Sequence, residues 1–168
     1  MAILSKDQII SIESSAQDVL LSVFGNIDSV ELPIKISEIL EKYNFNLQKG
    51  KFKDDSVVGI YDKQNSTIYV NVDDPYPRQV FTVAHELGHY FLHADKHQEI
   101  YYRKELTKLD GENPPQESEA NWFAASLLMP KKLILKYWEL TQDIEKLAQI
   151  FGVSPSAVYF RLKNLQLI

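Results

Sequence analysis

The segment Val83–His93, which reads VAHELGHYFLH, limits the fold of this chain most strongly, because it places three histidines at intervals of four residues. Apolar residues recur around the histidines at helical spacing, and this pattern predicts an amphipathic helix. His85 and His89 then lie on one face of that helix, about one turn apart. Two imidazoles with this spacing can bind one tetrahedral Zn²⁺ ion. We expect the HExxH pattern by chance in well under about 1% of chains of this length, so we interpret both histidines as metal ligands.

Glu86 directly follows the first of these histidines and projects about 100° away from it around the helix. At that angle the carboxylate lies beside the metal site without binding the ion. A zinc ion lowers the pKa of its bound water towards about 7, and a neighbouring carboxylate can take up the proton. The sequence therefore predicts metal-dependent hydrolysis, with Glu86 as the catalytic general base.

A catalytic zinc site also needs a third protein ligand. The chain has no cysteine, so this ligand must be His, Asp or Glu. His93 is a poor choice, because it lies about 12 Å from His85 along a straight helix, too far to share an ion. We expect His93 at the end of the helix or in the wall of a cleft.

Glu117 and Glu119 are the better candidates for the third ligand, in the segment PPQESEANWFAASLLMP. They lie about 200° apart on the predicted helix, so only one of them can face the metal. We favour Glu117 over Glu119, because its face continues with small residues that allow close helix packing. Glu117 also lies in the first turn, where the helix dipole favours a carboxylate. Asn121, one turn further on, can accept the free N–H of a ligating histidine.

The rest of the chain predicts an α+β fold. Two runs of β-branched and aromatic residues flank a polar turn at 63–66 and indicate a hairpin within 57–72. Apolar periodicity and the positions of Pro and Gly predict helices at 7–24, 33–43, 116–129, 131–140, 143–152 and 154–165, with a further strand within 45–52.

Residues 94–115 are polar and read as a long surface excursion, with a short strand at 99–103. Its residues Tyr101, Tyr102, Arg103 and His97 are candidates for a cleft wall that stabilises an oxyanion. Taken singly, each is better explained as an ordinary surface residue.

The C-terminal segment LAQIFGVSPSAVYFRL has the spacing of a helix-turn-helix, with Gly152 at the turn. Its second helix has only Arg161 and Lys163 as charged residues, beside Tyr159 and Phe160. The chain also has a formal net charge of −5, which argues against a protein that mainly coats nucleic acid. We therefore favour a packing element or a protein-binding surface over direct DNA binding.

Three motifs of the chain resemble the ImmA/IrrE family of metallopeptidases. They are TVAHELGHYFLH at 82–93, ESEANWFAASLLMP at 117–130 and LAQIFGVSPSAVYFRLKNL at 147–165. In the wider gluzincin group the third ligand is a Glu followed four residues later by an Asp, and Glu117 and Asn121 occupy these positions. The resemblance implies a small mixed or antiparallel sheet packed on a zincin-like helical core. It also implies an intracellular zinc endopeptidase that acts on helix-turn-helix repressors.

Two interpretations of function follow, and they differ in the role of the metal. The first is a zinc endopeptidase with a peptidase domain at 1–138 and a helix-turn-helix-like subdomain at 139–168. The alternative is a regulator that binds DNA or protein and uses its zinc only for structure.

The N-terminal residues lack the apolar stretch of a signal peptide. No run of about 18 apolar residues occurs, so we expect a cytoplasmic protein that does not bind membranes.

Overall fold

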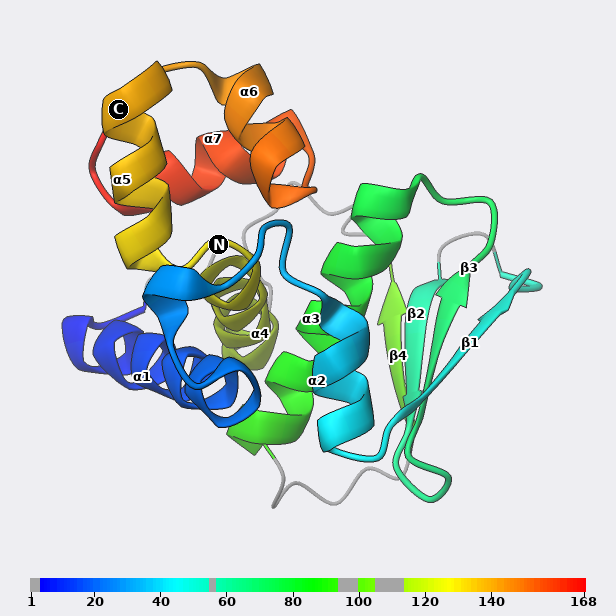
Figure 1. Ribbon diagram of the computed structural model, residues 1–168. Helices are drawn as coiled ribbons and strands as arrows, with labels where there is room; N and C mark the ends of the chain where they lie inside the picture. Colours follow the sequence, from blue (N-terminus) through cyan, green and yellow to red (C-terminus); the bar gives the residue numbers. More distant parts are fainter. Residues whose placement is uncertain (1–3, 55–56, 94–99, 105–113) are drawn as a thin grey trace.

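The computed structural model describes residues 4–54, 57–93, 100–104 and 114–168, and for residues 100–104 it describes the backbone. This part of the chain has the predicted α+β fold (Figure 1). Its elements are, in order, α1 (Lys6–Phe24), the 3₁₀ helix η1 (Ile27–Ser29), α2 (Ile36–Lys42), β1 (Asn46–Gly50), β2 (Val57–Asp62), β3 (Thr67–Asn71), α3 (Tyr76–His93), β4 (Ile100–Lys104), α4 (Pro115–Leu128), α5 (Lys131–Thr141), α6 (Ile144–Phe151) and α7 (Pro155–Asn164).

The four strands form one mixed sheet in the order β1-β3-β2-β4. β1 runs parallel to β3, whereas β2 pairs antiparallel with both β3 and β4. The predicted hairpin is the pair β2–β3. Its turn is held by Asp62, whose Oδ1 accepts hydrogen bonds from the backbone N–H groups of Gln64 and Asn65. β1 and β4 are the outer strands of the sheet among the described residues.

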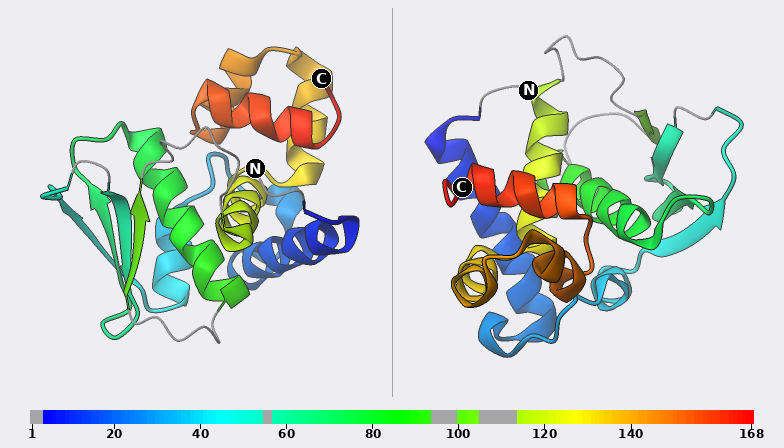
Figure 2. Two further views of the ribbon diagram at one scale, coloured as in Figure 1. Left: turned by 180° about the vertical axis from the view of Figure 1, so that it is seen from behind. Right: turned by 90° about the horizontal axis from the view of Figure 1, so that it is seen from above.

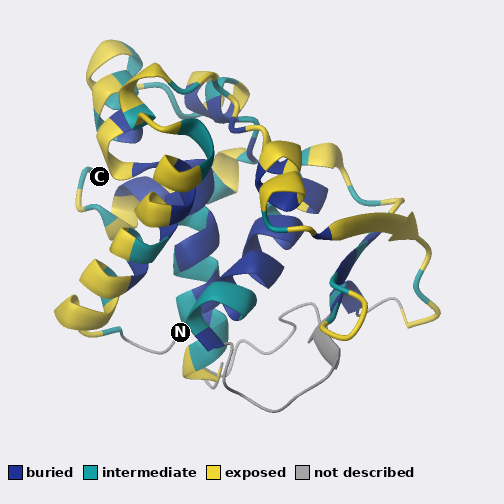
Figure 3. Cartoon of the chain, turned by 60° about the horizontal axis from the view of Figure 1, so that its bottom comes forward, coloured by how far each residue is buried: buried dark blue, intermediate teal, exposed yellow. Residues whose placement is uncertain are grey.

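The helices gather on one side of the sheet, and α3 lies between the sheet and α4 (Figures 1 and 2). Buried residues of α3 such as Val83 and Leu87 join one hydrophobic core with Ile68 and Val70 of β3. Figure 3 shows the buried segments facing this interior and the exposed segments at the periphery. The histidine helix is therefore packed on two sides, which fixes the direction of its side chains.

Close contact between α3 and α4 depends on small residues. A Cβ atom at Gly88 would lie 3.0 Å from Ala120 Cα and 3.1 Å from the Ala120 carbonyl oxygen. Both distances are shorter than ordinary van der Waals contact. Glycine at position 88 lets the backbones of the two helices approach this closely without displacement, and this approach brings side chains of α4 to the histidines of α3.

The helix pair α6–α7 begins and ends as its sequence predicts. Ser154 caps α7 by accepting a hydrogen bond from the Ala157 backbone N–H, and Gly152 ends α6 in the left-handed conformation, with φ of 64°. The boundary that we predicted between residues 138 and 139 lies within α5. The division into two domains stays a prediction.

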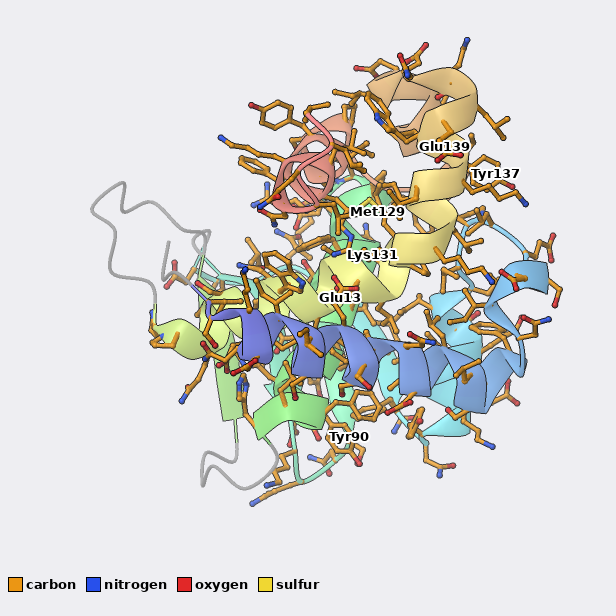
Figure 4. All side chains as sticks on the ribbon, turned by 90° about the vertical axis from the view of Figure 1, so that its left-hand side faces the viewer. Glu13, Tyr90, Met129, Lys131, Tyr137 and Glu139 are labelled. Atoms are coloured by element: carbon orange, nitrogen blue, oxygen red, sulfur yellow. The ribbon has the colours of Figure 1, made fainter. Side chains whose placement is uncertain are left out.

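A buried ion pair joins α7 to the rest of the molecule. Arg161 is 1% exposed and donates to both carboxylate oxygens of Glu13 on α1, at 2.6 and 3.1 Å. Its Nε donates to the Met129 carbonyl oxygen at 3.1 Å. Figure 4 shows Glu13 and Met129 between α1 and α7.

No described helix is both long and apolar enough to cross a membrane.

Candidate metal centre

The structure brings His85 and His89 of α3 together with Glu117 of α4. The Nε2 atoms of the two histidines are 3.0 Å apart. Glu117 Oε2 lies 3.2 Å from His85 Nε2, and Glu117 Oε1 lies 3.1 Å from His89 Nε2. The histidines are 0% and 6% exposed. Among the residues that the structure describes, these three form the group whose ligand atoms lie close enough together to hold one metal ion.

The spacing of these three donor groups fits a zinc ion. Zinc–ligand bonds of about 2.0–2.1 Å in a tetrahedral site place the donor atoms about 3.3 Å apart. The three observed separations of 3.0 to 3.2 Å are close to this value. Two neutral nitrogens and one carboxylate oxygen are also the donor set of many catalytic zinc sites, which keep a fourth position for water or substrate.

The carboxylate of Glu117 is electrostatically suited to be an anionic ligand. Burial raises its pKa, but hydrogen bonds and charge interactions with His85 and His89 outweigh this effect and hold the pKa well below its ordinary value. Glu117 lies in the first turn of α4, where the helix dipole also favours a negative charge. The group is therefore ionised at neutral pH.

Glu86 lies apart from the three ligand groups, between α3 and the sheet. It is 1% exposed, and it faces β2 at Gly59, where a Cβ atom would lie 3.2 Å from Glu86 Oε1. The same Cβ atom would collide with the side-chain methyl of Thr82. Gly59 therefore leaves the space in which the Glu86 carboxylate sits. The strand pattern of VVGIYD gave no indication of this role.

Asn121 lies behind the first histidine, one turn beyond Glu117 on α4. Its Oδ1 is 2.9 Å from His85 Nδ1. When His85 binds a metal ion through Nε2, its Nδ1 carries the proton and donates it to this oxygen. The amide is thus placed to hold the tautomer and the ring orientation that a metal ligand would require.

His93 and Glu119 form a pair behind the second histidine. His93, the last residue of α3, is 6% exposed, and its Nδ1 lies 3.2 Å from His89 Nδ1. Its Nε2 lies 2.7 Å from Glu119 Oε2. The sequence indicated Glu119 only as a rival ligand and gave no sign of this pairing, because the pairing depends on how α3 and α4 lie against each other.

The other cleft candidates fall outside what the structure describes. His97 and most of the excursion 94–115 are not among the described residues, and only the backbone of Tyr101, Tyr102 and Arg103 is described, in β4. Their contribution to a cleft wall stays a prediction.

A pocket of about 410 Å³ lies along the face of α4 that includes Ser118 and Asn121. Most of its lining is apolar and includes Phe81, Trp122 and Phe160. Ser118 Oγ is buried and has no hydrogen-bond partner among the described residues. The pocket is thus mainly apolar, and it lies on the face of α4 that includes Asn121.

Comparisons with known proteins give consistent matches. The family model of peptidase M78, described as the IrrE N-terminal-like domain, matches residues 40–163. "Uncharacterized immunity region protein 2" of Bacillus phage phi105 is 30% identical over 108 residues, which cover 62% of this chain and 66% of that protein. "Metallopeptidase ImmA" of Bacillus subtilis (strain 168) is 26% identical over 107 residues, which cover 62% of this chain and 61% of that protein. The matched segments thus span less than two thirds of either relative.

A solved structure is similar over nearly the whole chain. It is described as a Mycobacterium tuberculosis transcriptional regulator, and it matches with a TM-score of 0.61 and 18% sequence identity. The match covers 94% of this chain and 47% of that chain. At this identity the likeness shows the fold alone.

Proposed function

Since the chain belongs to the peptidase M78 family, whose model is described as the IrrE N-terminal-like domain, we propose that it is a zinc-dependent endopeptidase with His85, His89 and Glu117 as metal ligands. The observation that carries this proposal is the mutual spacing of 3.0 to 3.2 Å between the three donor groups. These groups come from two helices that contact each other closely at Gly88. The similarity to a protein named a metallopeptidase supports the same activity.

A zinc ion in such a site activates water and polarises the carbonyl group of a peptide bond. Glu86 would take up a proton from the attacking water on its carboxylate and deliver it to the nitrogen of the amine that is released when the peptide C–N bond breaks. The burial of Glu86 against β2 keeps the carboxylate in place and away from bulk water. Asn121 keeps the proton of His85 on Nδ1, so that Nε2 is available as a ligand.

The test of the catalytic role is the variant Glu86→Gln. It should keep the fold and one zinc ion per chain, as measured by circular dichroism and elemental analysis, but it should lose cleavage of a protein substrate. The matched control is Glu139→Gln, which makes the same change at an exposed position of α5 and should cleave as the wild type does. Unchanged cleavage by Glu86→Gln at full zinc content would contradict the role of Glu86 as general base.

For the substrate we propose a folded helix-turn-helix repressor in the cytoplasm, cut at one or a few bonds. The name of the phage relative, an immunity region protein, supports a regulatory substrate. The test compares the repressor encoded beside this gene with casein, which is unstructured. Rapid general digestion of casein with the repressor left intact would count against the proposal.

Two aromatic residues on α7 are our candidates for docking this substrate. Tyr159 and Phe160 are 43% and 53% exposed, and aromatic residues are favoured anchors at protein interfaces. Phe160 also lines the pocket that includes Asn121, so a protein docked on α7 would lie near the residue that contacts His85 Nδ1. Replacing both by Ala should slow cleavage of the folded repressor but not of a short peptide with the same bond. Leu140→Ala, at a residue 71% exposed on α5, is the control.

The alternative function, a DNA- or protein-binding regulator with a structural zinc, has less support. Arg161, one of the two basic residues that α7 would offer to DNA, is buried and paired with Glu13. Lys163 is exposed, but a single lysine supplies little of the phosphate neutralisation that DNA binding requires. Salt-dependent DNA binding that survives Glu86→Gln, together with an absence of proteolysis, would favour this alternative.

A further inference from the structure

We propose that His93 and Glu119 are positioning residues that hold the imidazole of His89 in the orientation required for metal binding. The inference rests on the proposed metal site. Its basis is a continuous row of close contacts, from His89 Nδ1 to His93 Nδ1 at 3.2 Å and from His93 Nε2 to Glu119 Oε2 at 2.7 Å. We call these residues the His89–His93–Glu119 chain.

The hydrogen bonds of this chain have one direction when His89 is a ligand. A neutral imidazole that binds a metal through Nε2 carries its proton on Nδ1. His89 therefore donates from Nδ1, and His93 accepts at its own Nδ1. A neutral His93 then carries its proton on Nε2 and donates it to the Glu119 carboxylate. Each of the two contacts thus has one donor and one acceptor, without any change of charge.

The Glu119 end of the His89–His93–Glu119 chain is held in place by a residue of α1. The second carboxylate oxygen of Glu119, Oε1, accepts a hydrogen bond from Gln8 Nε2 at 3.0 Å. Gln8 is itself fixed in the capping box of α1. Its side-chain oxygen accepts from the Ser5 backbone N–H at 2.9 Å, and its backbone N–H donates to Ser5 Oγ at 3.2 Å. Both oxygens of Glu119 are therefore held, and the carboxylate is oriented towards His93.

The burial of His93 and Glu119 strengthens the hydrogen bond between them. The side chains of His93 and Glu119 are 4% and 20% exposed, so water competes little for their hydrogen bond. A short contact to an ionised acceptor is also stronger than one between neutral groups. His85, by comparison, is held by the neutral amide of Asn121. The two ligating histidines are thus supported differently, and a carboxylate acts on His89 through a second imidazole.

Zinc affinity is the first test, measured on the full chain by competition with a chromophoric chelator. Replacing a residue that hydrogen-bonds to a metal ligand typically weakens metal affinity by about 10–100-fold. We expect about tenfold weaker binding for Glu119→Gln, which keeps the shape of the side chain but removes the charge. We expect a loss towards about 100-fold for His93→Phe, which cannot accept the proton of His89. Glu139→Gln should bind zinc as the wild type does.

Two further measurements separate positioning from a general structural role. In the zinc-loaded wild type, long-range ¹H–¹⁵N NMR should show His89 protonated on Nδ1 and His93 on Nε2. In cobalt-substituted protein, Glu119→Gln should shift the visible absorption bands, while the unfolding midpoint of the metal-free protein stays near that of the wild type.

Each outcome bears on the inference. His93 protonated on Nδ1, or a zinc affinity of Glu119→Gln within twofold of the wild type, would overturn it and leave the proposed ligands intact. A wild-type chain that binds no zinc would refute the proposed function and this inference together. If His93→Phe does not fold, the isosteric Glu119→Gln and the wild-type NMR spectrum still decide.

Discussion

Replacing Glu13 by Gln should lower the free energy of unfolding by about 3 kcal/mol at neutral pH. Arg161 lies on α7 with a side chain that is 0% exposed, and Glu13 is the carboxylate that pairs with it. The substitution leaves the guanidinium group buried without its counter-charge. The pair connects α7 to α1, so the C-terminal helices should be the part of the molecule most affected.

The magnitude follows from burial and geometry. Breaking a buried ion pair by removing one partner costs about 3–5 kcal/mol. The side chain of Glu13 is 22% exposed, so water can replace part of the lost interaction, and we take the lower end of this range. Gln also retains an oxygen for the hydrogen bond that Trp122 Nε1 donates at 3.0 Å. For a chain of this size, about 3 kcal/mol corresponds to a fall in the melting temperature of roughly 6–12 °C.

The effect should depend on pH in a defined direction. Burial raises the pKa of Glu13, but the hydrogen bond and charge of Arg161, with hydrogen bonds from Trp122 and Ser126, outweigh it and hold the pKa below its ordinary value of 4.5. A carboxyl group whose pKa is lowered by folding stabilises the protein above its unfolded-state pKa. This stabilisation declines as the pH falls through the folded-state pKa. The difference between wild type and Glu13→Gln should therefore be constant from pH 7 to about 5 and shrink below that.

Urea unfolding, followed by circular dichroism and tryptophan fluorescence, measures this difference at each pH. Glu139→Gln is the control for the loss of one negative charge, and it should change the free energy of unfolding by less than about 0.5 kcal/mol. A loss below about 1 kcal/mol for Glu13→Gln, or a difference that grows as the pH falls, would refute the reasoning.

Four substitutions test the candidate metal centre. Glu117→Ala should lose most of the bound zinc by elemental analysis, whereas Glu119→Gln should still reach one equivalent at saturating zinc; the reverse would overturn the choice of ligand. Gly88→Ala should cost about 1–3 kcal/mol in urea unfolding and weaken zinc binding, because its Cβ atom would lie 3.0 Å from Ala120 Cα. Gly59→Ala should reduce cleavage at unchanged zinc content by displacing Glu86, and full activity would show that this space is not needed.

Much of the fold follows from local patterns in the sequence. The helix predicted at 7–24 is Lys6–Phe24, and the hairpin predicted within 57–72 is formed by Val57–Asp62 and Thr67–Asn71. The family inferred from the three motifs is confirmed by the family model. These features were predictable because caps, turn residues and apolar periodicity act over a few residues.

Other features depend on contacts that local patterns do not contain. The second helix begins at Ile36 rather than near Pro33, and Ile34, which precedes it, is buried in the core at 4% exposure. The 3₁₀ helix η1 had no signal that we recognised. A strand was predicted within 45–52, but its parallel pairing with β3 was not, since the choice of partner is set by the packing of the whole sheet.

The residues of the candidate site also fall into those that local sequence patterns predict and those that depend on contacts between helices. The spacing of His85 and His89 is a property of one helix, so its sequence is sufficient to predict that both side chains share a face. The prediction of Glu117 as a ligand required a second helix to lie against the histidine helix. The periodicity of small residues around Glu117 indicated which face of that second helix packs there. The sequence shows His93 and Glu119 only as separate residues, because their contact depends on the relative position of two helices.

The contact between α3 and α4 explains why these features occur together. A third ligand can lie 3.1 to 3.2 Å from two histidines of another helix only if the two backbones are close, and Gly88 against Ala120 provides that closeness. Glu119 precedes Ala120 directly, so the same approach brings its carboxylate to the end of α3, where His93 lies. The HExxH helix alone would supply two nitrogens and the proposed general base. Its glycine lets the neighbouring helix come close enough to supply the proposed third ligand and the carboxylate that we propose orients His89.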